Sequence, residues 1–525
     1  MEFKKINKIS KEQLLLIILL ITQVFTMIIW GQNKQGFFMD EISTYGLSNS
    51  YYNPFTNWNA DYYNEWKTTD YYMSYVETHE GTQFRYDSVY YNQSIDVHPP
   101  LYYYLLHTVC SFFPDQFTKW FGIGLNIVFY LIANILIFKI SKKYFQDKWL
   151  WYIPVLFYGF SIVAASTVMF IRMYMLMTLL VLFLLYVHTY YVFDQDTLDK
   201  KSMILCAIAT WLGSSTQYFF IYIAFFLTVF TCIWFAIKKQ FKVMIKYALS
   251  MLCGIILLAI TFPPMFKHVF SGYRGVETIN NLTSFSDKST AIKEYLYVIF
   301  NGMFAGLGTN IPIVITGIAA LLILVIAGKI VYDRKQYGIA VIIMTIICYF
   351  VMIAVGVSGV VSRHLYCIYP LIAIVAVWIF ASILSTRTSK AVTRIITIIF
   401  SIVICFVGYV NKDVEWLYQG GDYAKFLAYY NRETPAIFLC DMGYESSSNY
   451  FEMAEYDSFA VVRYESEDIL SQLLEQKNNP MQLIIYVVND QRGSEMVNEV
   501  AMQYGYAEIK QLNLYNGTLC YLLTK

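Results

Sequence analysis

Long apolar runs recur along this chain and constrain its fold more than any other feature. A bilayer core of about 30 Å is crossed by a helix of roughly twenty apolar residues. Eleven runs of this kind occupy residues 13–31, 119–140, 149–167, 170–193, 202–217, 218–237, 243–262, 311–331, 338–357, 365–384 and 392–410. Only 14% of the residues are charged, against 57% hydrophobic, which lies outside the range of soluble proteins. Because lipid admits only helices or closed barrels, we predict a polytopic α-helical membrane protein.

Basic residues in alternate loops predict the orientation of these spans. The loops that we expect in the cytoplasm hold Lys139, Lys142, Lys143, Lys148, Lys238, Lys239, Lys242, Lys246, Lys329, Arg334, Lys335, Arg387, Lys390 and Arg394. Residues 32–100, by contrast, contain nine Asp or Glu and three Lys or Arg. The first run has no small-x-small cleavage site, so we interpret it as a retained span with a cytoplasmic N-terminus. Acidic exterior segments argue against nucleic acid as a partner.

The spans divide the chain into a membrane domain, residues 1–410, and an exterior tail, residues 411–525. A first exterior loop, 32–118, is rich in tyrosine, and a second, 263–305, is long enough to cover a cavity at the membrane surface. In the tail, short apolar runs and helical patterns predict a small α/β domain. We expect strands at 436–439, 458–462 and 483–488, helices at 466–476 and 492–504, and a hairpin at 512–524 around Asn516-Gly517. The tail has no glycine-rich phosphate loop, so we interpret it as a packing or acceptor-positioning module.

Asp40 and Glu41 form an acidic pair just past the first span. Two carboxylates at this place are easily ionised and can meet a substrate that is embedded in lipid. Taken alone, the pair is also typical of the start of a solvated loop. A carboxylate can accept the proton of an attacking hydroxyl, and we therefore select Asp40 as a candidate base, with Glu41 beside it.

Several basic and aromatic residues are expected on the same face of the membrane as this pair. Charge at the mouth of a helix bundle is costly and is a sign of function. The candidates are His98, which opens an interfacial helix at 99–113, Arg172 and Tyr174 at the end of the fourth span, and Arg363 and His364 between the ninth and tenth. Arginine matches phosphate oxygens, and histidine can donate to phosphate or bind a metal. Snorkelling arginines and a helix-capping histidine are the simpler alternatives.

The chain resembles the GT-C glycosyltransferases in three segments: Asp40-Glu41 after the first span, His98-Pro99-Pro100-Leu101-Tyr102 at the end of the loop, and Arg172-Met173-Tyr174. It looks most like the bacterial family 39 branch, which is related to protein O-mannosyltransferases and the aminoarabinose transferases of lipid A. The resemblance covers roughly residues 1–410 and leaves out the tail.

The resemblance implies an inverting transfer of a monosaccharide from a polyprenyl-phosphate donor, at the outer face of a bacterial plasma membrane. It makes Asp40 the base or acceptor-binding carboxylate and Glu41 its supporting acid. His98 then lies near the donor phosphate or a divalent metal, which Asp96 would help to bind, and Arg172 and Arg363 face the phosphate. The acceptor is a cell-envelope glycan, a lipid-linked saccharide or a protein.

Three other functions are compatible with the same residues. A flippase or transporter of lipid-linked saccharides predicts charges along a path at mid-bilayer, whereas here they gather at one face. A lipid-linked oligosaccharide polymerase or ligase is poorly distinguished from a monosaccharide transferase. A membrane scaffold without activity would tolerate the loss of Asp40.

Overall fold

The computed structural model describes residues 10–193, 195–284, 288–304, 337–385, 388–411, 414–417, 431–440, 449–463, 467–487, 490–513 and 518–525. Two compact units emerge from the contacts within the chain. The first, which we call the helical unit, comprises Met1–Gly31, Val97–Tyr102 and Ile123–Glu415. The second, the α/β unit, comprises Gln32–Asp96, Tyr103–Gly122 and Trp416–Lys525.

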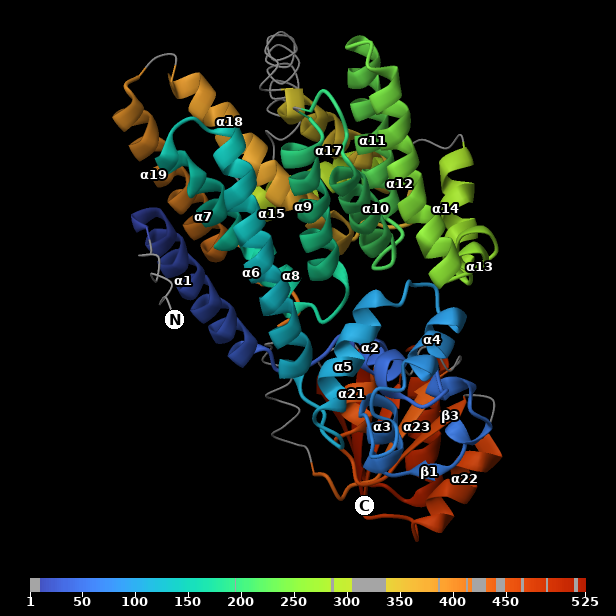
Figure 1. Ribbon diagram of the computed structural model, residues 1–525. Helices are drawn as coiled ribbons and strands as arrows, with labels where there is room; N and C mark the ends of the chain where they lie inside the picture. Colours follow the sequence, from blue (N-terminus) through green and yellow to red (C-terminus); the bar gives the residue numbers. More distant parts are fainter. Residues whose placement is uncertain are drawn as a thin grey trace, which may run out of the picture. The chain divides into compact units, whose positions relative to one another are not determined.

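Eight helices in the described residues are long and apolar enough to cross a membrane (Figure 1). They are α1 (Lys11–Asn33), α6 (Lys119–Tyr144), α9 (Tyr174–Tyr191), α11 (Phe220–Ile237), α12 (Phe241–Thr261), α17 (Tyr337–Gly356), η4 with α18 (Ser362–Ile368 and Tyr369–Ser385) and α19 (Lys390–Asn411). Large apolar side chains on α1, α12 and α19 are exposed, among them Ile18, Phe25, Ile256, Ile399 and Phe406. Such a surface is unfavourable in water and suits contact with lipid. The prediction of an α-helical membrane protein is confirmed.

The predicted span at 149–167 is not one straight helix. It begins in a short 3-10 turn, η3 (Lys148–Trp151), and continues as α7 (Ile153–Gly159) and α8 (Ile162–Met169). The segment Lys148–Gly159 and α8 are bent by 55° relative to each other. The break falls at Ser161, whose side chain accepts a hydrogen bond from the backbone N–H of Ala164 at 3.2 Å and so caps α8.

The run at 202–217 forms a helix shorter than a span. Helix α10 (Lys200–Ser214) has 15 residues, about 22 Å at 1.5 Å per residue. The polar residues Ser215, Thr216 and Gln217 lie between it and α11. The predicted span at 311–331 and the Asn516-Gly517 turn lie outside the described residues.

The second exterior loop is helical where it is described. It contains α13 (Met265–Phe270), α14 (Tyr273–Thr283) and α15 (Ser289–Phe304), all within the helical unit. The first exterior loop holds α2 (Met39–Asn49), η1 (Thr56–Trp58), η2 (Ala60–Tyr62), α3 (Thr69–Val76), α4 (Tyr86–Ile95) and α5 (Leu101–Ser111). The last of these is the helix predicted after His98-Pro99-Pro100.

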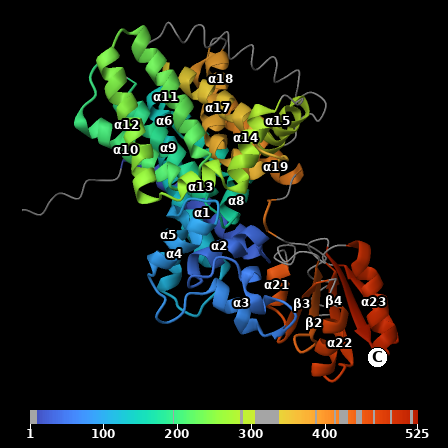
Figure 2. The same cartoon turned by 90° about the vertical axis from the view of Figure 1, so that its right-hand side faces the viewer.

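A six-stranded sheet in the order β1-β3-β2-β4-β6-β5 forms the centre of the α/β unit (Figure 2). Its strands are β1 (Trp66–Lys67), β2 (Ala436–Cys440), β3 (Phe459–Arg463), β4 (Gln482–Val487), β5 (Glu508–Asn513) and β6 (Leu519–Thr524). Strands β2, β3 and β4 are parallel, and β6 pairs antiparallel with both β4 and β5. These strands match the predicted tail strands to within a few residues. The predicted helices appear as α22 (Glu467–Gln476) and α23 (Asp490–Tyr504).

One face of the sheet packs against α22 and α23. Alternate residues of a strand point to opposite faces, so Ile437 and Leu439 join this core while Phe438, between them, stacks on Tyr486 at 4.2 Å on the other face. Helix α21 (Tyr450–Met453) packs with α2 and α3 of the exterior loop.

The first exterior loop also contributes a strand to the sheet, which the sequence pattern did not predict. Strand β1 has two residues and pairs antiparallel with β3, with Trp66 opposite Ala460. The indole N–H of Trp66 donates to the carbonyl of Leu473 at 2.9 Å. The contacts therefore group much of this loop with the tail in the α/β unit.

Candidate functional site

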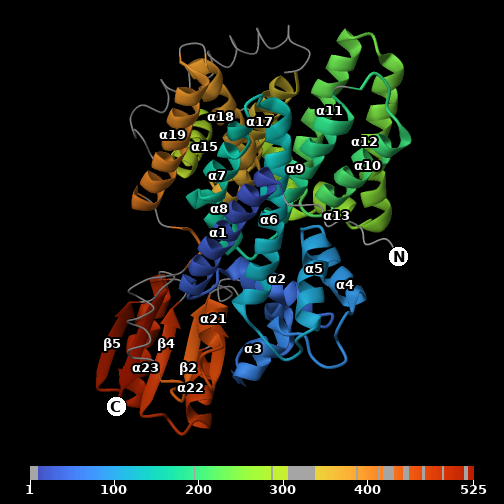
Figure 3. The same cartoon turned by 60° about the vertical axis from the view of Figure 1, so that its left-hand side comes forward.

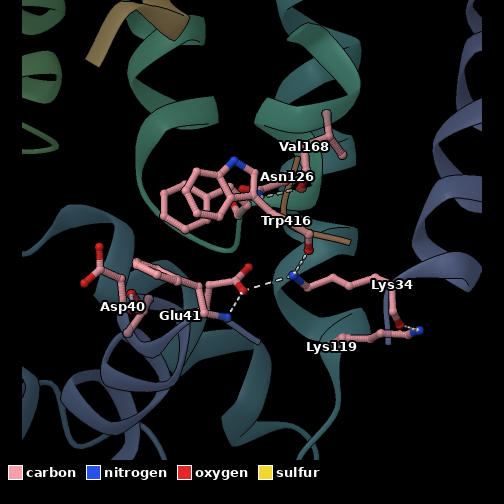
Figure 4. Close-up of polar contacts among 10 residues, drawn as sticks. Lys34, Asp40, Glu41, Lys119, Asn126, Val168 and Trp416 are labelled. Atoms are coloured by element: carbon pink, nitrogen blue, oxygen red, sulfur yellow. Dashed lines mark hydrogen bonds and ion pairs between the residues drawn. The ribbon is translucent and has the colours of Figure 1, made fainter. Parts of the chain in front are cut away.

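The connection between α8 and α9 carries Arg172 in the helical unit. Asn126 of α6 is buried and donates to the carbonyls of Val168 and Phe170, at 3.0 and 2.9 Å (Figure 4). These bonds satisfy carbonyls that the end of α8 leaves without helical partners. They also fix the turn in which the backbone N–H of Arg172 donates to the carbonyl of Phe170 at 2.7 Å.

Arg172 is 4% exposed, and its guanidinium Nη2 lies 3.3 Å from Nε2 of His98. When this histidine nitrogen is unprotonated, the arginine donates to it. The structure thus brings together two predicted site residues that are 74 positions apart in the sequence. A guanidinium keeps its charge at physiological pH, so Arg172 supplies a buried positive charge at this end of the helical unit.

Tyr174, Arg363 and His364 join the same group of side chains. The ring of Phe170 stacks on that of Tyr174 at 5.7 Å, and the Arg363 guanidinium lies over Phe170 at 5.7 Å. The Tyr174 ring is 6.3 Å from the His364 ring. The five predicted residues of the helical unit therefore come from three segments: the chain before α5, the α8–α9 connection with the first residue of α9, and η4. We call His98, Arg172, Tyr174, Arg363 and His364 the basic cluster.

Glu415 borders the basic cluster and was missed in the sequence. Its Oε2 accepts hydrogen bonds from the Ser362 hydroxyl at 2.7 Å and the Tyr366 hydroxyl at 2.6 Å, and Tyr366 contacts Tyr174 edge-on at 6.2 Å. The backbone N–H of Glu415 donates to Ser166 Oγ of α8 at 3.0 Å. A cavity of about 20 Å³ beside Glu415 has room for about one water. No charge pattern singles out this residue, because it follows the last span as one of many acids.

Asp40 and Glu41 begin α2 in the α/β unit, where acidic side chains interact favourably with the helix dipole. Their environments differ. Glu41 is fully buried, and its Oε2 accepts from Lys34 Nζ at 2.9 Å and from the backbone N–H of Phe38 at 2.7 Å. Asp40 is half-buried, and its carboxylate points away from the Lys34–Glu41 pair (Figure 4).

Lys34 also makes hydrogen bonds to residues of the α/β unit that are far away in the sequence. Its Nζ also donates to the carbonyl of Trp416 at 2.5 Å, and Lys119 Nζ donates to the carbonyl of Lys34. Burial lowers the pKa of the Lys34 ammonium, and the charge of Glu41 opposes that shift. These contacts give Glu41 a structural task at the start of α2, whereas its predicted catalytic role stays a prediction.

The predicted metal ligands lie in different units. Asp96 follows α4 in the α/β unit, and His98 belongs to the helical unit. Arg172 beside Nε2 of His98 opposes a divalent cation at that nitrogen. Within the described part of the chain, three candidate ligands lie close together elsewhere: Glu77, His79 and Asp115 of the α/β unit, within 4.8 Å of one another.

No protein-family model matches the sequence, and no curated protein does. Solved structures show similarity of fold. ArnT from Cupriavidus metallidurans bound to undecaprenyl phosphate is 9% identical, with a TM-score of 0.53 over 97% of this chain and 98% of that one. The apo state of the same protein gives 10% identity and a TM-score of 0.51, over 96% and 97%. An oligosaccharyltransferase from Archaeoglobus fulgidus is 11% identical, with a TM-score of 0.46 over 89% and 68%. The fold of this chain is therefore similar to that of ArnT, as the resemblance to GT-C proteins predicted.

Proposed function

We propose that the chain is a glycosyltransferase that moves a monosaccharide from a polyprenyl-phosphate donor to a hydroxyl acceptor. The observation that carries the proposal is the basic cluster. Two arginines and two histidines are brought together at one end of a helical unit whose fold is that of ArnT, a protein crystallised with undecaprenyl phosphate. Arginine forks suit phosphate oxygens, and adjoining apolar helices suit an isoprenoid chain.

In the proposed reaction Asp40 accepts the proton of the acceptor hydroxyl. The hydroxyl oxygen attacks the anomeric carbon of the donor sugar and forms the new glycosidic bond. The bond between that carbon and the phosphate oxygen breaks, and its electron pair remains on the phosphate. Arg172 and Arg363 stabilise this leaving phosphate, and the configuration of the sugar is inverted in a single displacement.

Glu41 has a different part in this proposal. Its carboxylate holds Lys34 and the first turn of α2, and Asp40 is the adjacent residue of that turn. We therefore assign Glu41 as a positioning residue and Asp40 alone as the base. No step uses a metal, since Arg172 already supplies positive charge at His98.

The test is transfer by the full chain in native membranes, supplied with undecaprenyl-phosphate monosaccharides and followed by mass spectrometry of envelope glycans. Asp40→Asn is expected to lower transfer by roughly 10² to 10⁴, the usual contribution of a general base, with normal expression. Asp61→Asn is the matched control, because Asp61 is an acid of the same unit that is half exposed and pairs with Lys67.

Normal turnover by Asp40→Asn contradicts the assignment of the base. The lipid product separates the related enzyme classes: a monosaccharide transferase releases polyprenyl phosphate, whereas a polymerase or ligase releases the pyrophosphate. Movement of the donor across vesicles without any glycosylated product would instead indicate a flippase.

A further inference from the structure

A wide cavity lies at the end of the helical unit where α6 and α18 end and α19 begins. It has a volume of about 540 Å³, within the range of roughly 300 to 1,000 Å³ for ligand sites. Its lining includes Asp147, Lys148, Trp149, Trp378, Lys390 and Arg394. Helices α7, α18 and α19 pack together beside it (Figure 3).

The cavity is far from the basic cluster. Helix α18 follows η4, which carries Arg363, and its 17 residues extend about 25 Å before it ends at Ser385 on the cavity wall. Most of the thickness of a bilayer therefore separates the two groups of cations. The cavity lies where the loop charges predict the cytoplasmic surface.

Three cations and one acid line the cavity. Lys148 pairs with Glu12 of α1 at 2.8 Å, and the one acid, Asp147, is also engaged. One oxygen of Asp147 accepts from the backbone N–H of Trp149 at 3.1 Å, and the other pairs with Arg394 Nε. Within the described ranges, the terminal guanidinium nitrogens of Arg394 and the Lys390 ammonium have no hydrogen-bond or ion-pair partner. The cavity thus presents charges that fit a phosphate group.

Exposed apolar side chains occur in the same ends of α18 and α19 that supply the lining. Ile383 of α18 and Val392 and Ile395 of α19 are 40%, 43% and 57% exposed. Trp149 is 52% exposed, and tryptophan favours the membrane–water interface. Cations next to an exposed apolar surface at the end of a span match a ligand with a charged headgroup and acyl chains.

We propose that this cavity binds the headgroup of an anionic phospholipid, with the phosphodiester at Lys390 and Arg394 and the acyl chains along Ile383 and Ile395. Basic pockets between helices on the cytoplasmic side bind anionic lipid headgroups in other membrane proteins. The site is independent of the proposed transfer reaction.

The experiment measures how much lipid the purified, delipidated full chain retains in detergent, by mass spectrometry after addition of phosphatidylglycerol or phosphatidylcholine. We expect phosphatidylglycerol to bind more tightly, and Lys390→Gln/Arg394→Gln to weaken its binding roughly ten- to thirty-fold, at about a factor of five per charge. Lys242→Gln/Lys246→Gln is the matched control, because both lysines are exposed on α12, belong to loops with the same predicted orientation and do not line the cavity.

Additional variants and a competing anion distinguish lipid binding from misfolding and from binding of free phosphate. In Lys390→Gln alone, Asp147 keeps its partner Arg394, and in Asp147→Asn/Arg394→Gln the carboxylate is removed together with that partner. Weaker lipid binding in both variants therefore excludes misfolding as the cause. Inorganic phosphate is added as a competitor, and it is expected not to displace the lipid at millimolar concentration. Equal retention of the two lipids, unchanged binding by Lys390→Gln/Arg394→Gln, or displacement by phosphate alone would overturn the proposal.

Discussion

The two units of this protein bury their ionisable side chains in different ways. In the α/β unit, Lys34 and Glu41 are both buried and pair at 2.9 Å, and Glu452, 2% exposed, has a pKa that burial raises to about 7. In the helical unit, Arg172 is 4% exposed and lies beside His98. When it is buried, a lysine pairs with an acid or loses its proton, and a carboxylate can take up a proton. An arginine instead keeps its charge.

This difference distinguishes buried charges that stabilise the fold from the charges that we propose to bind a ligand. In the α/β unit the buried Lys34–Glu41 pair neutralises itself, as expected for groups that hold a fold together. The basic cluster contains two arginines that stay charged at any working pH, which suits an anionic ligand such as a lipid phosphate. Four predictions test this division, beginning with the largest expected effect.

Removing Glu41 should destabilise the α/β unit most. Glu41→Ala leaves the Lys34 ammonium buried without its carboxylate, which typically costs about 3 to 5 kcal/mol. The measurement is thermal or denaturant unfolding of the purified protein. Lys34→Met/Glu41→Leu should recover much of the loss, and Asp87→Ala, which breaks the exposed pair with Arg85, should leave the unfolding temperature unchanged. A similar loss in Asp87→Ala would show that burial is not the cause.

Glu452 should make the stability of the α/β unit depend on pH. Its pKa in the folded state, about 7, exceeds its ordinary value of 4.5, so between these values the folded state binds more protons than the unfolded one. This contribution is fully present below about pH 4.5 and is lost as pH rises through about 7. At about 1.4 kcal/mol per pKa unit, the free energy of unfolding falls by at most roughly 3 kcal/mol over this range.

Hydrogen exchange of the tail strands between pH 5 and 8 measures this dependence. Glu452→Gln should flatten the profile, whereas Glu475→Gln, on the exposed side of α22, should not. A profile that keeps its slope in Glu452→Gln would assign the effect to another group.

Arg172→Gln should weaken use of the donor roughly 10- to 100-fold, since a hydrogen bond to a charged group contributes about 1.5 to 3 kcal/mol. The effect is expected mainly in the KM for the polyprenyl-phosphate sugar. Lys246→Gln, an exposed cation of the same unit, serves as the control. An unchanged KM in Arg172→Gln would remove this residue from the phosphate site.

Chelation should have the smallest effect. Because Arg172 supplies the positive charge at His98, we expect transfer to continue after EDTA treatment and dialysis. Lost activity that returns with a divalent cation would support the predicted metal at His98 and Asp96. Glu77→Gln would then show whether the separate group with His79 and Asp115 is the site that matters.

The prediction from sequence was most successful where local pattern is sufficient. An apolar run of about twenty residues has few alternatives to a membrane span, so the spans around α6 and α17 appear with boundaries close to those expected. Short buried strands such as β2 and β4 also stand out by composition. The bend between α7 and α8 was not predicted, because a serine cap within an apolar run gives only a weak signal.

Hydrophobicity and charge along the chain were sufficient to predict the membrane class, the order of spans and the strands of the tail. They also selected Asp40, Arg172 and His98 as candidates, because each of these predictions depends on residues near its own position. Only the folded chain shows that Glu41 is buried against Lys34, that Lys34 donates to a carbonyl 382 residues away, and that Trp66 belongs to a strand of the tail sheet. Such pairings join groups that are far apart in the chain, so no local sequence pattern predicts them. Many lysines and acids could pair, and packing selects one pair by excluding water from it.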